Sequence, residues 1–203
     1  MSKGDDTRNR ILGECARQTA ARGLGGVSLN DIAAAVGMSK SGLFKHFESK
    51  EEMQHAVLEQ VLDHFLEFVW RPAEELTAGR KRLQKVFDRW LKWNETECVV
   101  GGCPIAAASV ELDDQPGKLR DYLQMRMRRW HDRLTAEMQQ LRDPPMKEDE
   151  ARRAVFQMRS FILGYGEARR LMEDPHARRA ARAAFDSLLD RTEHPPELEA
   201  LED

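Results

Sequence analysis

The chain has 203 residues, of which 41% are hydrophobic and 33% charged, and its formal net charge is −3. This composition suits a soluble protein with a buried core, and no segment approaches the roughly 18 to 20 apolar residues of a membrane span. The first ten residues lack the apolar stretch of a secretory signal peptide. Cys15, Cys98 and Cys103 have no zinc-type spacing. We therefore expect a cytoplasmic protein with no metal, no cofactor and no membrane partner.

The charge is divided unevenly along the chain. Residues 1–50 contain eight Lys or Arg against five Asp or Glu, whereas the rest contains 24 against 30. A basic N-terminal piece on an acidic body favours contact between the first fifty residues and a polyanion.

The first helices are predicted by spacing and by capping residues. Apolar residues recur at helical spacing over 5–22, and Gly23 supplies a stop. Ser28 and Asp31 have capping-box spacing before a second, short helix over 29–36. The glycine-rich segment between the two is expected to be a loop.

Two further helices follow a tight turn that contains Gly37. Ser39 is placed to cap a third helix over 40–47, and Ser49 to cap a long fourth helix over 50–70. Two short helices joined by such a turn have the sequence form of a helix-turn-helix unit.

The remainder is also predicted to be helical, and no strand pattern is present. Its expected helices cover 74–96, a small-residue segment after Pro104, 116–141, 147–172 and a last helix from 177. The predicted fold class is all-α. It comprises an N-terminal helix-turn-helix domain over 1–52, a connecting fourth helix and a larger helical domain over 53–203.

The third helix has two kinds of surface. Leu43 and Phe47 are four residues apart and are expected to be buried, whereas Phe44 lies where it could meet a thymine methyl group. A recognition helix reaches base edges with its first turns, and capped helix N-termini offer amides to phosphate. The predicted DNA-binding residues are Ser28, Ser39, Lys40, Ser41, Gly42, Phe44, Lys45, His46 and Lys50. The alternative is an ordinary three-helix core with solvated charges; a membrane-surface role is disfavoured because the helix is short.

The segment from Thr7 to Met53 closely resembles the N-terminal domain of the tetracycline-repressor family of bacterial transcription regulators. The resemblance is carried by "VGMSKSGLFKHF" and by Ile11, Leu12, Ala16, Gly23, Ser28, Ile32, Ala33 and Lys50. It implies a dimer that binds a palindromic operator, and a ligand in the C-terminal domain that moves the fourth helix and respaces the recognition helices. The family's DNA contacts would fall on Ser28, Lys40, Ser41, Phe44, Lys45, His46 and Lys50. Phe44 departs from the tyrosine common in the family and lacks its hydroxyl.

The C-terminal body is predicted to bind a small, hydrophobic effector. Its "GGCPIAAASVELDDQPGKLRDYL" segment resembles one found in a subgroup of these regulators, which supports the fold without identifying a ligand. Large apolar side chains with polar tips suit such a pocket, although the same pattern is typical of an ordinary core. The predicted lining residues are Trp90, Trp93, Cys103, Ile105, Met125, Trp130, Met158, Phe161 and Tyr165.

Three further interpretations concern the body. Cys98 or Cys103, beside Gly-Gly at a helix start, could be a thiol of lowered pKa that senses oxidants or electrophiles. An enzyme is disfavoured because no nucleophile–base or metal-ligand set is present. The last two long helices are expected to form a homodimer through small residues, with Phe185, Leu188 and Leu189 adding apolar area.

Overall fold

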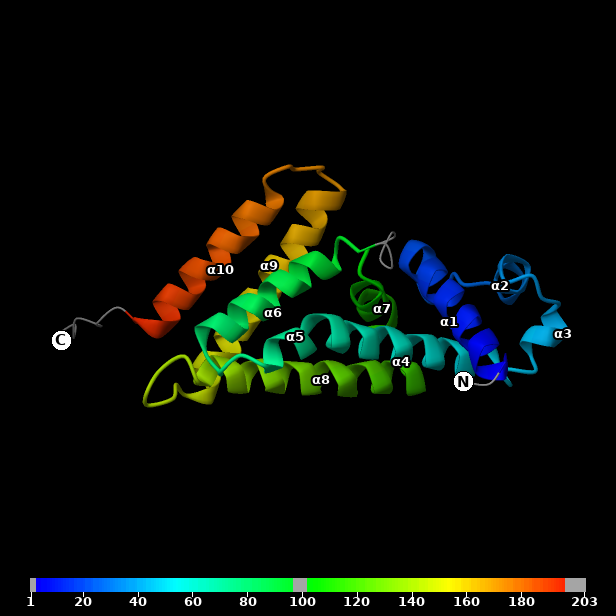
Figure 1. Cartoon of the computed structure of the whole chain (residues 1–203), viewed down its shortest axis with the longest axis horizontal. Helices are drawn as coiled ribbons and strands as arrows, with labels where there is room; N and C mark the ends of the chain where they lie inside the picture. The colour runs from blue at the N-terminus through cyan, green and yellow to red at the C-terminus, as the bar shows by residue number, and fades with distance from the viewer. Residues whose placement is uncertain (1–2, 97–101, 196–203) are drawn as a thin grey trace. The chain divides into compact units, whose positions relative to one another are not determined.

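The computed structural model describes residues 3–96 and 102–195, which form ten helices and contain no strand (Figure 1). The predicted all-α fold class is confirmed over these residues. The helices are α1 Lys3–Arg22, α2 Leu29–Ala35, α3 Lys40–Leu43, α4 Lys50–Val69, α5 Arg71–Glu74, α6 Arg80–Trp93, α7 Pro104–Leu112, α8 Lys118–Gln139, α9 Glu148–Arg170 and α10 Ala177–Glu193.

The chain divides into two compact units, and the first contains the helix-turn-helix. It comprises Met1–Phe68 and Lys92–Met127. Ile32 of α2 and Leu43 of α3 are fully buried with Ile11 of α1, and the Cys15 thiol lies 3.5 Å from the sulfur of Met53 in α4. The short helices α2 and α3 are therefore stabilised by a core that they share with α1 and α4, as their length requires.

The second unit comprises Val69–Leu91 and Arg128–Asp203, in which α9 packs against α10. Phe87 of α6 stacks on Phe185 of α10 with ring centroids 4.1 Å apart. Leu188 and Leu189 are also buried within this unit. The expectation that Phe185, Leu188 and Leu189 would face a second subunit is therefore wrong, because all three side chains are buried in the core of their own chain.

One predicted helix is shorter than expected. The helix predicted over 74–96 corresponds to α6, which spans Arg80–Trp93, and the short α5 before it ends at Glu74. Gly79 adopts a positive φ of 118°, which a helix interior does not allow. The Arg82 guanidinium donates to the carbonyl of Leu76 at 2.7 Å and thereby holds the break.

The third helix is shorter than predicted. α3 ends at Leu43, and the chain continues in a tighter turn, because the amides of Lys45 and His46 donate to carbonyls three residues back at 3.3 and 2.9 Å. The side chains of Phe44, Lys45 and His46 therefore lie on a turn and not on a regular α-helix.

Candidate nucleic-acid interface

Three serines cap the helices of the helix-turn-helix segment, as their spacing predicts. Ser39 Oγ accepts from the amide of Gly42 at 3.1 Å, and Ser28 Oγ from the amide of Asp31 at 3.5 Å. Ser49 caps α4, because its Oγ accepts from the amide of Glu52 at 3.0 Å, and the Glu52 carboxylate accepts from the amide of Glu48, the residue before the cap, at 2.6 Å.

Burial divides the third helix and its turn into two faces. Leu43 is 0% and Phe47 2% exposed, whereas Phe44 is 42% exposed. Lys40, Ser41 and Lys45 are also exposed. The predicted burial of Leu43 and Phe47 is confirmed, and the exposed face combines two ammonium groups, a hydroxyl and one aromatic ring. Such a face can contact phosphates, base edges and thymine methyl groups.

Three other predicted DNA-binding residues have partners within the protein. Lys50 Nζ donates to the carbonyl of Gly25 at 3.0 Å, and the half-buried His46 accepts through its carbonyl from Arg8 at 2.6 Å. A Cβ atom on Gly42 would lie 3.3 Å from Ser39 Oγ. Gly42 therefore makes room for the helix cap, which is a reason for a glycine here that the sequence did not reveal.

Two arginines of α1 were missed by sequence reasoning. The Arg8 guanidinium lies 4.3 Å from the centre of the Phe47 ring, in addition to its bond to His46, and Arg10 donates to the carbonyl of Val36 at 2.7 Å. They hold the chain just before and just after α3. Because their partners lie 38 and 26 residues away, no local pattern could have identified them.

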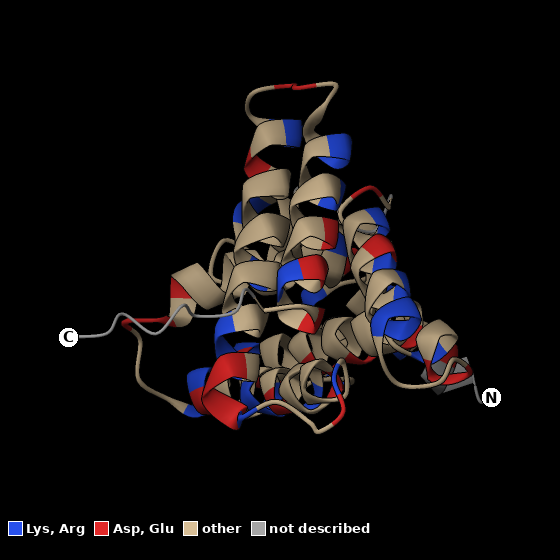
Figure 2. Cartoon of the chain, turned by 90° about the vertical axis from the view of Figure 1, so that its left-hand side faces the viewer, with Lys and Arg blue, Asp and Glu red and all other residues tan. Residues whose placement is uncertain are grey.

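The charges are mixed along the helices. Figure 2 shows Lys and Arg interspersed with Asp and Glu on the elements it displays.

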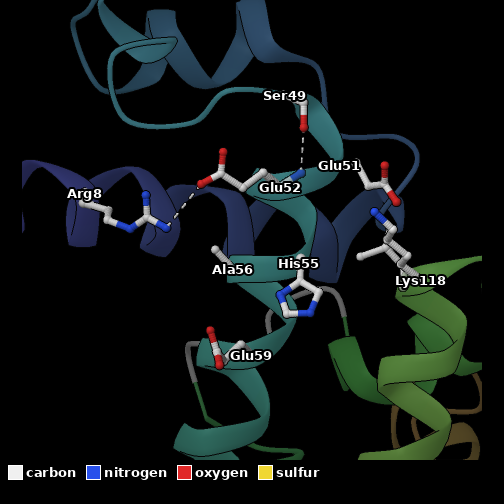
Figure 3. Close-up of a pocket in the computed structure, with 9 residues that line it drawn as sticks. Arg8, Ser49, Glu51, Glu52, His55, Ala56, Glu59 and Lys118 are labelled. Atoms are coloured by element: carbon white, nitrogen blue, oxygen red, sulfur yellow. Dashed lines mark hydrogen bonds and ion pairs between the residues drawn. The ribbon is translucent and has the colours of Figure 1, made fainter.

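An open pocket in the first unit has a volume of about 300 Å³ and is lined mainly by charged side chains (Figure 3). Arg8 of α1 pairs with Glu52 of α4 across it at 3.9 Å, while Glu51 and Glu59 of α4 and Lys118 of α8 also line it. None of the nine residues predicted for the hydrophobic effector lines this pocket.

The nine predicted effector residues fall in both units. Trp93 and Cys103 meet in the first unit, where the indole N–H donates to the thiol sulfur at 3.4 Å. Trp90 and Trp130 meet in the second, with ring centroids 5.5 Å apart. Ile105 and Met125 lie in the first unit, and Met158, Phe161 and Tyr165 in the second. Trp90, Trp93, Ile105, Trp130, Met158 and Tyr165 are buried, so in this structure they are core residues.

The environment of Cys103 argues against this thiol as the sensor of the thiol-sensing alternative. Burial raises the pKa of the Cys103 thiol, against the opposing effect of amide hydrogen bonds at the start of α7 and of the Trp93 indole. A sensing thiol needs a lowered pKa, because the thiolate is the reactive form. Burial also raises the pKa of Cys15, to about 12. Cys98 lies outside the described residues.

Residues 3–96 and 102–195 contain neither a membrane-spanning helix nor a metal site. No helix there is both long and apolar enough to cross a membrane. The same residues contain no group of three His, Cys, Asp or Glu side chains placed to hold a metal ion.

Comparison with protein families gives two matches that together cover most of the chain. Residues 11–57 match the family described as "Bacterial regulatory proteins, tetR family", and residues 79–185 match the "Tetracyclin repressor-like, C-terminal domain". The second match alone covers more than half of the chain.

Two curated relatives come from Mycolicibacterium smegmatis. The transcriptional activator FasR is 29% identical over 91 residues, which are 45% of this chain and 42% of FasR. The transcriptional repressor KstR2 is 35% identical over 78 residues, which are 35% of this chain and 38% of KstR2. The chain thus matches less than half the length of either relative.

Solved structures resemble the chain over nearly its whole length. A TetR transcriptional regulator from Chloroflexus aurantiacus is 25% identical and has a TM-score of 0.73, with 94% of this chain and 96% of that chain covered. AibR, solved in complex with isovaleryl coenzyme A and operator DNA, is 21% identical and has a TM-score of 0.68, with 90% and 96% covered. The prediction of a regulator rather than an enzyme is confirmed by the matched families. The chain belongs to the tetracycline-repressor (tetR) family of bacterial transcription regulators.

Proposed function

We propose that the chain is a transcriptional repressor that binds a palindromic operator as a homodimer and releases it on binding a small hydrophobic effector. The observation that carries this proposal is the exposed face of the third helix and its turn, with Lys40, Ser41, Phe44 and Lys45 outward over buried Leu43 and Phe47. This face lies within the segment that matches the DNA-binding part of the family.

The proposed contacts divide by chemistry. Lys40, Ser41 and Phe44 read base edges, and Lys45, His46 and Lys50 bind phosphates. Ser28, Ser39 and Gly42 act through the capped helix starts, where backbone amides favour an anion. Arg8 and Arg10 support the reading by fixing the backbone on both sides of α3, so the outward side chains meet DNA from one defined position.

The proposed dimer uses α9 and α10. Phe156 and Leu163 of α9 are 73% and 57% exposed and lie seven residues apart on one side of the helix. A Cβ atom on Gly164 or Gly166 would meet nothing within 4 Å, so this part of α9 is open to close approach. An apolar side chain on an otherwise charged surface is favourably covered by a second copy across a twofold axis.

The effector proposal concerns the aromatic clusters of the body. Trp90 and Trp130 in the second unit, and Trp93 with Cys103 in the first, offer apolar surface with indole and thiol tips. AibR was solved with an acyl thioester and DNA, which supports a ligand-responsive role for this fold. Because the side chains of these clusters pack tightly, an effector has to separate them in order to bind. This changes the surroundings of the indole rings, so the intrinsic tryptophan fluorescence is expected to change on binding.

Repression is proposed over activation for a physical reason. Occupancy of promoter DNA is sufficient to block transcription, whereas activation needs an additional surface for the polymerase. The relatives include both modes, since KstR2 is a repressor and FasR an activator.

The function is tested by a mobility-shift assay with the DNA beside the chain's own gene and with unrelated DNA of equal length. Specific binding is expected, and Lys40→Ala and Lys45→Ala should each weaken it while circular dichroism stays unchanged. Loss of Lys45 should also reduce the salt dependence, by about one phosphate contact per subunit. Equal binding to both DNAs at physiological salt would contradict operator recognition.

A further inference from the structure

The loop between α1 and α2 is bound by a carboxylate that lies 86 residues further along the chain. Glu111 of α7 accepts hydrogen bonds from two consecutive amides, those of Leu24, at 2.6 Å, and of Gly25. Both partners belong to the first compact unit, in which α7 packs against α1. One carboxylate that accepts from two adjacent backbone N–H groups is a charge-assisted arrangement, stronger than a pair of neutral hydrogen bonds.

The glycines of this loop fit the carboxylate. A Cβ atom on Gly25 would lie 2.6 Å from Glu111 Oε1, and one on Gly23 would lie 2.8 Å from Oε2. Gly23 also has a positive φ of 78°, whereas Gly25 has no such requirement. A glycine is therefore needed at position 25 because the Glu111 carboxylate occupies the space of a Cβ atom, and not because the backbone has a positive φ.

The same two loop residues are bound from the other side by the start of α4. Lys50 Nζ donates to the carbonyl of Gly25 at 3.0 Å, and Gln54 Nε2 donates to the carbonyl of Leu24 at 2.9 Å. The amides of Leu24 and Gly25 thus point to α7 and their carbonyls to α4. These two residues therefore link α7 to α4 through hydrogen bonds, a few residues before α2 begins at Leu29.

The other end of α7 adjoins a residue of the proposed effector set. Cys103 is the N-cap of α7, and its sulfur accepts from the Trp93 indole at 3.4 Å. Ile105, Ala108 and Leu112 bury one face of α7 along its length. α7 therefore runs from an aromatic cluster at its start to the Glu111 carboxylate in its last turn.

We propose that Glu111 is a positioning residue for operator binding, which ties the α1–α2 loop and the start of α4 to α7 and so fixes where the recognition helix stands. This inference rests on the proposed function. Glu111 contacts no DNA in this account; it acts through Leu24 and Gly25. Loss of Glu111 should therefore lower the affinity for a complete operator, which requires two recognition helices at the correct spacing. It should not lower the affinity for a single half-site, which requires only one.

The test compares two duplexes in a fluorescence-anisotropy titration of the full chain. One is the best sequence that the wild type selects from a random DNA library, and the other has one of its half-sites scrambled. Glu111→Gln keeps the side-chain shape but presents an N–H₂ group to one of the two amides. We expect about a tenfold loss of affinity for the complete operator, which is about 1.4 kcal/mol, and less than a twofold change for the half-site duplex. Asp113→Asn, which removes a nearby exposed charge, should change neither.

A comparison of Gly25→Ala in two backgrounds distinguishes the proposed interaction from a general loss of stability. Gly25→Ala should weaken binding to the complete operator in the wild-type background, because the added methyl displaces the Glu111 carboxylate. The same substitution should have less than a twofold effect in Glu111→Ala, where nothing is displaced. Hydrogen exchange at the Leu24 and Gly25 amides should become faster in Glu111→Gln.

Three outcomes would overturn the inference. Unchanged affinity of Glu111→Gln for the complete operator would do so, as would equal losses for the complete and half-site duplexes, or equal effects of Gly25→Ala in both backgrounds. In each case a wild type that selects a sequence leaves the proposed function standing. A wild type that selects no sequence would overturn the proposed function and this inference together.

Discussion

Phe44 and Phe47 lie three residues apart in one turn, yet their surroundings differ. Phe47 is 2% exposed beneath the Arg8 guanidinium, and Phe44 is 42% exposed. The sequence indicated this division because Leu43 and Phe47 have the i, i+4 spacing of one helix face. It did not indicate the arginine that covers Phe47, which depends on how α1 lies against the third helix.

The two phenylalanines should therefore respond differently to truncation. Phe47→Ala removes a buried ring and is expected to lower the free energy of unfolding by about 3 kcal/mol or more. Phe44→Ala should change it by less than about 0.5 kcal/mol, as is usual for an exposed position. Urea denaturation of both variants measures this, and a similar loss in both would contradict the assigned faces.

His131 gives the chain a pH-dependent stability. Its Nε2 atom is buried with no hydrogen-bond partner, and the charges of Arg159, Asp132 and Arg152 act on the ring. Burial, followed by the charge of Arg159, lowers the pKa of His131 to about 4 from an ordinary value of 6.5. Between these two values the unfolded chain binds a proton that the folded chain does not, so stability falls as the pH drops through this window.

The expected loss between pH 7 and pH 5 from His131 is about 1 kcal/mol, after allowance for its partial exposure. Urea denaturation at both pH values measures it. His131→Phe has no titrating group and should show a smaller loss than the wild type by that amount. An identical loss in wild type and variant would show that other groups produce the pH dependence.

At the scale of elements, the long helices were predictable and the junctions were not. α4, α9 and α10 follow from apolar periodicity, whereas the break before α6 depends on Gly79 and on the Arg82–Leu76 hydrogen bond. α3 is shorter than its periodicity predicts because its last residues turn more tightly into the start of α4. Glu111 was not predictable either, since its partners are backbone amides, which carry no residue-specific signal.

The Ser49 cap at the start of α4 should stabilise the protein. Ser49→Ala removes the acceptor of the Glu52 amide and is expected to destabilise the protein by about 1 kcal/mol. Ser187→Ala, at an exposed position inside α10, is the matched control and should change stability by less than about 0.5 kcal/mol. Thermal unfolding followed by circular dichroism distinguishes them, and equal midpoints would argue against the cap.

At the scale of the whole molecule, the central quantities are assembly and operator binding. The fold class and the family followed from the sequence because both depend on many ordered positions. The effector-binding residues could not be predicted from the sequence in the same way, because apolar side chains at helical spacing are equally typical of a core. Most of the predicted set is in fact buried. The proposed dimer face rests on Phe156 and Leu163, which are exposed, whereas Phe185 is buried, and helical spacing does not distinguish these two cases.

A charge on the proposed dimer face should separate the subunits. Phe156→Glu and Leu163→Glu are each expected to shift the chain from dimer to monomer at micromolar concentration, as measured by sedimentation velocity. Val110→Glu places the same charge on a 74% exposed side chain of α7 and should leave the dimer intact. A wild type that sediments as a monomer, or a dimer unaffected by both α9 variants, would contradict this interface.

The proposed function requires that the exposed face of the third helix and its turn touches operator DNA. The most direct measurement replaces Phe44 with a photo-crosslinking phenylalanine derivative and irradiates the chain on its selected operator, with Val110 replaced in the same way as the control. We predict crosslinks from position 44 at the same base step in each half-site, and none from position 110. Sequence-specific binding without any crosslink from position 44 would contradict the account.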